Sequence, residues 1–188
     1  MVDTQDTASR ARTRQAIIDA AIAVLGKNLS APLSEVATAA DVGRTTLHRY
    51  YPERSDLLSA VRAESVLRLE RATEHARLDE GTGAEALHRL CEEYFELGDV
   101  LSLVFGDPHC LEEVDRGQSG AEDRFKAVVE RGHRDGSIDP ELPATWLESV
   151  LWSQLYAAWS YVTDSGESRH HVLRLMLRTL AGAVSPPP

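Results

Sequence analysis

Cysteines and long apolar runs are scarce in this 188-residue chain. It contains two cysteines, Cys91 and Cys110, too few for the disulfide framework of a small secreted protein. No apolar run approaches the roughly 20 residues that span a bilayer, and the polar start MVDTQDTASR lacks the apolar core of a signal peptide. These absences predict a cytoplasmic protein that does not enter the membrane. Both cysteines are expected to be buried thiols, with a redox pair as the less favoured alternative.

Sequence signatures of catalysis are also missing. The chain has no Gly-rich phosphate loop, no nucleophile elbow and no HExxH pair. The segment GDPHC places Asp107, His109 and Cys110 close together, but no second ligand pair at a zinc-like spacing accompanies them. We therefore interpret this segment as a loop with incidental polar residues, and we expect neither an enzyme nor a site for a metal or cofactor.

Charge is unevenly distributed along the chain. The net charge is -10, which taken globally argues against DNA binding. Residues 10–54, however, hold seven basic and four acidic side chains, whereas residues 55–188 hold 13 basic and 24 acidic ones. A basic N-terminal module on an acidic body concentrates positive potential at one end. The alternative is that these basic side chains simply form the solvent-exposed face of a helix and bind nothing.

Hydrophobic periodicity predicts helix almost everywhere and no strand, so the expected fold class is all-α. A first helix is expected over about residues 12–27, because Ile17, Ile18, Ala21, Val24 and Leu25 recur at helical spacing. Further helical segments are expected at about 33–51 (as a helix pair), 56–78, 84–97, 125–134, 144–163 and 167–184, and residues 101–105 form a short apolar piece. Loops are expected at 79–83, 112–120 and 135–143, and the Ser-Pro-Pro-Pro tail is expected to be disordered.

Residues 33–57 are the most informative segment, because they have the pattern of two short helices joined by a tight turn. Asp41 is expected to take a left-handed conformation in the turn, which Asp tolerates. Gly43 then falls at the N-cap of the second helix, and Pro52 ends that helix. Ser55 is expected to cap the helix that follows. Helix pairs of this kind place a recognition helix in the major groove of DNA.

The recognition helix is expected at about residues 44–51, and most of its side chains can donate hydrogen bonds to a phosphate or a base edge. Tyr50, Tyr51 and Arg54 are expected to hold mainly the phosphate backbone. The predicted DNA-binding residues are Arg14, Arg44, Thr45, Thr46, His48, Arg49, Tyr50, Tyr51 and Arg54.

This segment resembles the tetracycline-repressor (TetR) family of bacterial regulators. The matching residues are Val36-Ala37, Ala40-Asp41-Val42-Gly43, Thr46-Leu47-His48-Arg49-Tyr50-Tyr51, Pro52, Arg54 and Leu57-Leu58. The chain departs from the family pattern at Asp41, Gly43 and His48, where Gly, Ser and Tyr are usual. The resemblance implies an N-terminal helix-turn-helix domain of three helices followed by a larger helical domain that binds an effector and dimerises.

The last two predicted helices carry wide apolar stripes. The resemblance implies that they form a four-helix bundle with the same helices of a second subunit, which would set two recognition helices one DNA turn apart. The expected interface residues are Leu151, Leu155, Leu173, Met176, Leu177 and Leu180. The alternative is that these stripes fill only the core of one subunit.

Bulky and partly polar side chains concentrate in the middle helices. Aromatic residues at helical spacing are more often plain core than pocket, but the resemblance implies a cavity there for a small effector. The candidate lining residues are Tyr94, Leu97, Leu101, Phe105, Phe125, Val129, Trp152, Tyr156 and Trp159.

The sequence as a whole predicts a homodimeric, sequence-specific transcriptional regulator. It would be a repressor released from a palindromic operator in double-stranded DNA by an unknown small molecule. Residues of about 10–54 would bind DNA, and residues of about 55–188 would dimerise and bind the effector. The alternative is a helical small-molecule-binding protein whose DNA module is vestigial.

Overall fold

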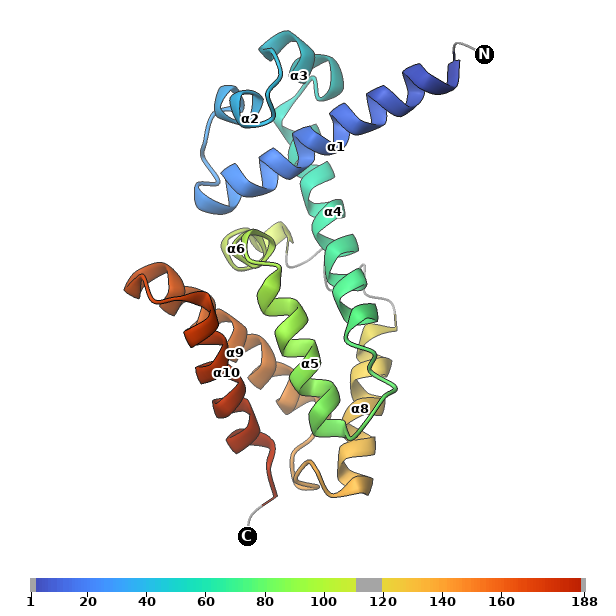
Figure 1. Ribbon diagram of the computed structural model, residues 1–188, viewed down its shortest axis with the longest axis vertical. Helices are drawn as coiled ribbons and strands as arrows, with labels where there is room; N and C mark the ends of the chain where they lie inside the picture. Colours follow the sequence, from blue (N-terminus) through green and yellow to red (C-terminus); the bar gives the residue numbers. More distant parts are fainter. Residues whose placement is uncertain (1–2, 111–119, 187–188) are drawn as a thin grey trace.

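The computed structural model describes residues 3–110 and 120–186, which form helices and connecting turns with no β-strand among them (Figure 1). The predicted all-α class is confirmed. The helices are α1 (Asp3–Lys27), α2 (Leu33–Ala39), α3 (Arg44–Tyr50), α4 (Arg54–His75), α5 (Gly83–Glu96), α6 (Asp99–Gly106), α8 (Ala121–Asp135), α9 (Ala144–Ser165) and α10 (Arg169–Val184).

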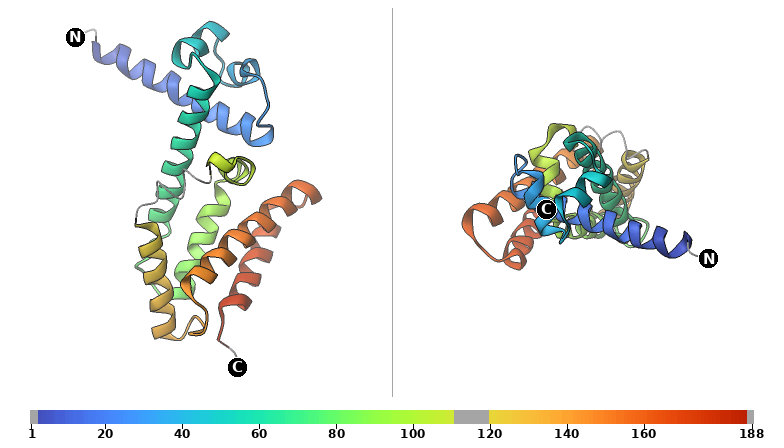
Figure 2. Two further views of the ribbon diagram at one scale, coloured as in Figure 1. Left: turned by 180° about the vertical axis from the view of Figure 1, so that it is seen from behind. Right: turned by 90° about the horizontal axis from the view of Figure 1, so that it is seen from above.

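The molecule is elongated, with α1, α2 and α3 at one end and the remaining helices below them. Helix α4 follows α3 and runs down the molecule beside α5, and it ends close to the start of α8, as Figures 1 and 2 show. Helix α5 is central, because it contacts α4, α8, α9 and α10. Helix α6 lies between the two parts of the molecule and packs against α1, α4 and α9. The N-terminal helices are therefore joined to the body by α4 and by α6.

Helix α1 begins nine residues earlier than its apolar periodicity predicts. Its first buried residue is Ile17, and residues 8–16 contain no buried side chain. Periodicity detects only the part of a helix that packs on a core. The preceding turns of α1 contain neither Pro nor Gly, so nothing in the sequence breaks the helix there.

The end of α4 is also displaced from the prediction, to His75 instead of Leu78. Arg77 has a positive φ of 45°, so the backbone turns there. The Arg89 guanidinium stabilises this turn by donating to the carbonyl oxygens of Ala76, Arg77 and Glu80 at 2.6–2.9 Å. A cap supplied from another helix has no local sequence signal, which explains the error.

Most of the other predicted boundaries agree with the structure to within a few residues. The loops expected at 79–83 and 135–143 connect helices as predicted. The loop expected at 112–120 and the end of the Ser-Pro-Pro-Pro tail lie almost entirely outside the described residues. Ser55 does not cap α4, because the helix begins at Arg54 and its N-cap is Glu53. The Glu53 backbone N–H donates to the Asp56 carboxylate at 3.0 Å.

Glycines bring α5 and α8 into backbone contact. A Cβ atom on Gly83 would lie 2.4 Å from the backbone nitrogen and Cα of Gly132, and a Cβ on Gly132 would meet Ile138 at 2.4 Å. Both distances are below van der Waals contact, so neither position has room for a side chain. This close approach holds the first turn of α5 against α8.

Both cysteines are buried thiols, as predicted. Burial raises the pKa of the Cys91 thiol to about 12, so this thiol stays protonated and unreactive. No helix in the described part of the chain is long and apolar enough to cross a membrane.

Candidate DNA-binding and effector sites

The turn between α2 and α3 has the geometry that the sequence predicts. Asp41 takes the left-handed conformation with φ of 53°, and Gly43 is the N-cap of α3. The Val42 N–H donates to the Ala37 carbonyl at 3.0 Å and closes the turn. Ala37 is buried, so this residue helps to fix how the two helices cross.

Helix α3 buries one side and exposes the other. Leu47 is its only fully buried residue, at 1 % exposure. Arg44, Thr45, His48 and Arg49 are exposed, whereas Thr46 and Tyr50 are half-buried. The exposed face therefore carries two guanidinium groups, a hydroxyl and an imidazole, all of which are suited to base edges and phosphates.

Tyr51 does not occupy the position expected of a phosphate contact. Its side chain is 2 % exposed, and its buried hydroxyl has no hydrogen-bond partner among the described residues. The Arg14 guanidinium lies 5.7 Å from the centre of the Tyr51 ring, within cation–π range. The prediction for Tyr51 is corrected: its ring packs beneath the end of α3 and supports Arg14, which remains exposed.

Arg54 also makes its contacts within the N-terminal helices. Its guanidinium donates to the carbonyl oxygen of Ala31 at 2.7 Å and to that of Leu29. These carbonyls belong to the loop between α1 and α2, so Arg54 ties the start of α4 to that loop. The structure gives Arg54 an internal role that the sequence did not predict, because its Nη1 and Nη2 already donate to main-chain carbonyls.

Arg54→Ala is therefore expected to destabilise the protein. Losing two hydrogen bonds from a charged donor should lower the free energy of unfolding by about 1.5–3 kcal/mol, as measured by urea denaturation. Arg44→Ala is the matched control, because Arg44 is exposed and its removal should leave stability unchanged. Unchanged stability of Arg54→Ala together with weaker DNA binding would contradict this role and restore the phosphate contact.

Five aromatic side chains from α5, α6 and α9 form a connected cluster. Phe105 lies at its centre, with ring centroids 5.3 Å from Tyr156, 5.9 Å from Trp159 and 6.3 Å from Trp152. Trp152 stacks on Tyr94 at 5.6 Å. These contacts bring together all five of the rings that the sequence predicts for α5, α6 and α9.

Two hydroxyl contacts anchor this aromatic cluster. The Trp159 Nε1–H donates to the Ser102 Oγ at 2.7 Å, which links the cluster to α6. The Tyr94 and Thr73 hydroxyl oxygens lie 2.8 Å apart in a buried hydrogen bond, which links the cluster to α4. The rings are thus connected to both helices that lead to the N-terminal end.

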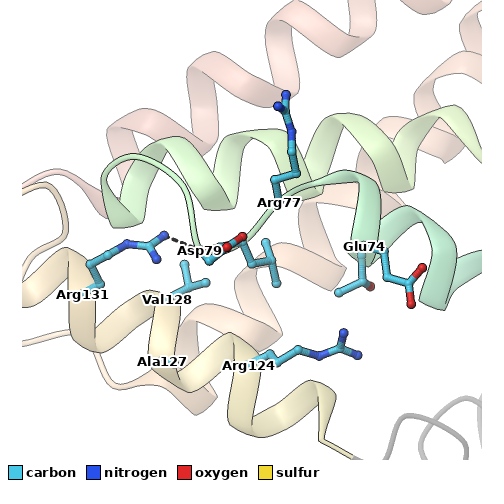
Figure 3. A pocket seen from close by; sticks show the side chains of 9 residues that line it. Glu74, Arg77, Asp79, Arg124, Ala127, Val128 and Arg131 are labelled. Carbon is cyan, nitrogen blue, oxygen red and sulfur yellow. Dashed lines mark hydrogen bonds between the residues drawn. The ribbon is translucent and has the colours of Figure 1, made fainter.

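Two neighbouring hollows lie beside the end of α4, and the inner one adjoins the cluster. The inner one has a volume of about 20 Å³ and is lined by Thr73, Leu78, Leu90, Tyr94, Phe125, Glu148, Leu151 and Trp152. The outer one, shown in Figure 3, has a volume of about 380 Å³ and lies between the end of α4 and α8. Thr73 and Leu78 line both hollows, so these two side chains form the wall between them.

The sequence identified only part of this lining. Tyr94, Phe125 and Trp152 line the inner hollow as expected. Leu101 and Val129 are instead buried in the core, and Leu97 and Phe105 pack against it. The lining from the end of α4 and from α8, including Thr73, Leu78, Arg124 and Arg131, was missed. No aromatic pattern marks these residues, and the turn that follows α4 depends on the distant Arg89.

The predicted interface residues on α9 and α10 lie inside the subunit. Leu151, Leu155, Met176, Leu177 and Leu180 are all buried, and Leu173 packs against the core. The exposed large apolar side chains on these helices are others, namely Trp146, Tyr156, Tyr161 and Leu175. Of these, Tyr161, which is 48 % exposed, and Leu175, which is 42 % exposed, line a groove of about 220 Å³ between α9 and α10. Of the predicted interface residues, Met176 also lines this groove, and the other five pack within the subunit.

The N-terminal helices and the body are also joined by polar contacts. Arg68 on α4 forms ion pairs with Asp19 on α1 and with Glu64. Arg62 on α4 pairs with Asp107 at 3.0 Å, so the acid of the GDPHC segment has a cationic partner. The described residues contain no group of three or more potential metal ligands.

Comparisons with known proteins place this architecture in a family. No family model matches the chain. The HTH-type transcriptional repressor LfrR of Mycolicibacterium smegmatis is 35% identical over 180 residues, which cover 95% of this chain and 94% of that protein. The crystal structure of LfrR in complex with proflavine has a TM-score of 0.72 at 32% identity, covering 95% of this chain and 99% of that one.

A more distant structure shares the fold alone. The ketosteroid regulator KstR2 of Mycobacterium tuberculosis has a TM-score of 0.74 at 11% identity, covering 100% of this chain and 98% of that one. The identity to LfrR, by contrast, extends over nearly the whole length of both proteins. The chain therefore belongs to the TetR-like family of helix-turn-helix transcriptional regulators, a family of DNA-binding proteins that are not enzymes.

Proposed function

We propose that this protein is a homodimeric repressor that binds a palindromic operator through α3 and leaves it when a planar aromatic molecule binds the helical body. The observation that carries this proposal is the exposed polar face of α3, in which Leu47 alone is fully buried. Arg44 and Arg49 extend from that face. Residues of about 10–54 would bind DNA, and residues of about 55–188 would dimerise and bind the effector.

The outer face of α9 and α10 is the proposed dimer interface. Its groove is lined by Gln154, Ala157, Ala158, Tyr161, Val172, Leu175, Met176 and Thr179, which are mostly apolar or small. Exposed Leu and Tyr side chains around such a groove suit a self-complementary contact about a two-fold axis. Two subunits joined there would present two copies of α3 to one DNA duplex.

The proposed effector site is the aromatic cluster reached through the outer hollow. The inner hollow of about 20 Å³ has room for about one water molecule, so an effector must displace side chains to enter. Thr73 and Leu78 separate it from the outer hollow. Moving them would join the two spaces beside Tyr94 and Trp152. Stacked rings favour a planar aromatic ligand, which agrees with the proflavine bound by LfrR.

Selection from random-sequence DNA tests the central part of this proposal. The protein is expected to enrich a palindromic site, whereas a protein with a vestigial DNA module would enrich none. Arg44→Ala should then weaken binding to the selected site by about 1–3 kcal/mol and relax the preference at one position of each half-site. Fluorescence anisotropy with selected and scrambled duplexes measures both effects.

Lys27→Ala is the matched control for Arg44→Ala. Lys27 is exposed at the far end of α1, so its loss removes one positive charge away from α3. It should leave the sequence preference unchanged. If Arg44→Ala weakened binding to selected and scrambled duplexes equally, Arg44 would contact phosphate alone and would not specify the base sequence.

A further inference from the structure

The corner between α5 and α6 is short and has an unusual backbone. Only Leu97 and Gly98 separate the two helices, and Gly98 takes a positive φ of 47°, a conformation that favours glycine. Helix α5 is central in the body, and α6 packs on α1 at the other side of the corner (Figure 1). The angle at this corner, together with α4, therefore sets how the N-terminal helices sit on the body.

Arg169, the first residue of α10, holds this corner from another helix. Its Nη2 donates to the Phe95 carbonyl at 2.7 Å and lies 3.9 Å from the Glu96 carboxylate. Its guanidinium carbon lies 5.0 Å from the centre of the Phe95 ring, within cation–π range. Phe95 and Glu96 are the last two residues of α5, where the helix dipole favours a cation. One side chain of α10 thus makes three different contacts with the end of α5.

The same guanidinium fills the space beside Gly98. A Cβ atom on Gly98 would lie 2.9 Å from the Arg169 Nη1, which is too close for a side chain. The Arg169 side chain is nevertheless 46 % exposed, and α10 is capped without it, because the Ser168 hydroxyl accepts from the His171 N–H at 3.2 Å. The contacts of Arg169 are therefore not needed to start α10, and what they fix is the corner.

Helix α6 carries the placement of this corner to the N-terminal helices. Asp99 follows Gly98 directly, and its carbonyl oxygen lies so close to α1 that a Cβ on Gly26 would meet it at 2.9 Å. At the other end of α6, Asp107 pairs with Arg62 of α4 at 3.0 Å. Closely packed elements transmit displacements to each other. A shift of the corner would therefore move α1, and with it α2, which packs on α1.

From these contacts we propose that Arg169 is a positioning residue that sets the separation of the two recognition helices in the dimer. It joins α10, one of the helices of the proposed dimer interface, to the corner that places α6 and α1. This inference rests on the proposed function, in which two copies of α3 bind half-sites about 34–36 Å apart. Arg169 would contact neither DNA nor effector. It would determine which spacing of half-sites the dimer accepts, and the bases that are read would stay the same.

The first test measures the separation of the subunits without DNA. A spin label is attached to Ala39→Cys, an exposed position at the end of α2, in a protein whose own cysteines are buried. Pulsed electron paramagnetic resonance gives the distribution of distances between the two labels of the dimer. Arg169→Ala should broaden this distribution by about 2 Å or more, which exceeds half of the rise of about 3.4 Å per base pair.

Arg124→Ala is the matched control for this measurement. It removes an exposed positive charge from α8, away from the corner, and should leave the distribution as in the wild type. An unchanged distribution in Arg169→Ala would overturn the proposal. Loss of the folded dimer in Arg169→Ala, measured by sedimentation equilibrium and circular dichroism, would make Arg169 a general stabilising residue and would overturn it too.

The second test uses the operator selected from random DNA, with one base pair inserted between its half-sites. The wild type should bind this duplex at least about tenfold more weakly, because one copy of α3 loses its base contacts. Arg169→Ala should reduce the ratio to about threefold or less. Arg169→Lys, which can still donate to the Phe95 carbonyl, should give a ratio between the two. An equal loss of affinity for both duplexes would contradict a positioning role.

The two tests separate this inference from the proposed function. If no site is selected, specific operator binding is refuted, and the distance distribution still decides the role of Arg169. If a site is selected and Arg169→Ala keeps the wild-type ratio between spacings, the proposed function stands and the inference fails. A monomeric wild type would refute the proposed dimer and, with it, a role of Arg169 in setting the separation.

Discussion

Leu175→Arg is expected to separate the proposed dimer into folded monomers that no longer bind the operator. Leu175 is 42 % exposed in the subunit, so a charged side chain there stays hydrated as long as the subunit is alone. In a dimer formed by α9 and α10 the same charge would be buried without a partner, which costs about 3–5 kcal/mol. Arg174 and Arg178 flank this position and repel an added cation. Dimer affinity should fall by at least about a hundredfold.

The control for this prediction is Leu67→Arg. Leu67 is 45 % exposed but lies on α4, away from the groove between α9 and α10. It should remain dimeric and bind operator as the wild type does. Sedimentation equilibrium gives the oligomeric state, circular dichroism verifies the fold, and anisotropy reports operator binding. A stable Leu175→Arg dimer would place the interface elsewhere.

The choice of Leu175 illustrates a limit of sequence patterns. Periodicity correctly predicts that α9 and α10 are long amphipathic helices, but Leu177 and Leu175 are both apolar and two residues apart. The structure buries Leu177 and exposes Leu175. A helix with apolar residues on more than one side does not specify which side packs within its own subunit.

At the N-terminal end too, features that depend on neighbouring residues were predicted, whereas features that depend on residues far away in the sequence were not. The turn at Asp41 and Gly43 depends on backbone preferences of adjacent residues, and it was predicted correctly. The roles of Tyr51 and Arg54 depend on Arg14 and on the Leu29 and Ala31 carbonyls. These partners are distant in the sequence. A local pattern such as Pro52 followed by Arg54 therefore cannot distinguish a phosphate contact from a hydrogen bond within the protein.

Helix α6 provides a direct contact between the aromatic cluster and the N-terminal helices. A Cβ atom on Gly26 of α1 would lie 2.9 Å from the Asp99 carbonyl and 3.4 Å from the Ser102 Cβ. Ser102 in turn accepts the hydrogen bond from Trp159. Movement of Trp159 would therefore be transmitted through α6 to the end of α1, in addition to any tilt of α4. Helix α4 offers a second route, because a helix without Gly or Pro in its interior would transmit a tilt along its length.

Proflavine and operator are accordingly expected to weaken the binding of each other. Two ligands that favour different arrangements of α6 and α1 must do so reciprocally, typically by 1–3 kcal/mol, or about 5- to 150-fold in affinity. Isothermal titration calorimetry of proflavine with the free protein and with its operator complex measures this ratio. Equal affinities in the two titrations would rule out the mechanism, however tightly the dye binds.

The variant Trp159→Phe tests whether the coupling between dye and operator can be lost while the dye still binds. Phenylalanine keeps an aromatic ring in the cluster but removes the N–H that donates to Ser102, so the dye should still bind while the ratio between the two affinities falls towards one. Tyr156→Phe is the matched control, because Tyr156 belongs to the same cluster and its ring is kept. Its ratio should equal that of the wild type. If Trp159→Phe retained the full ratio, the signal would have to pass through α4 alone, by way of the hydrogen bond between Tyr94 and Thr73.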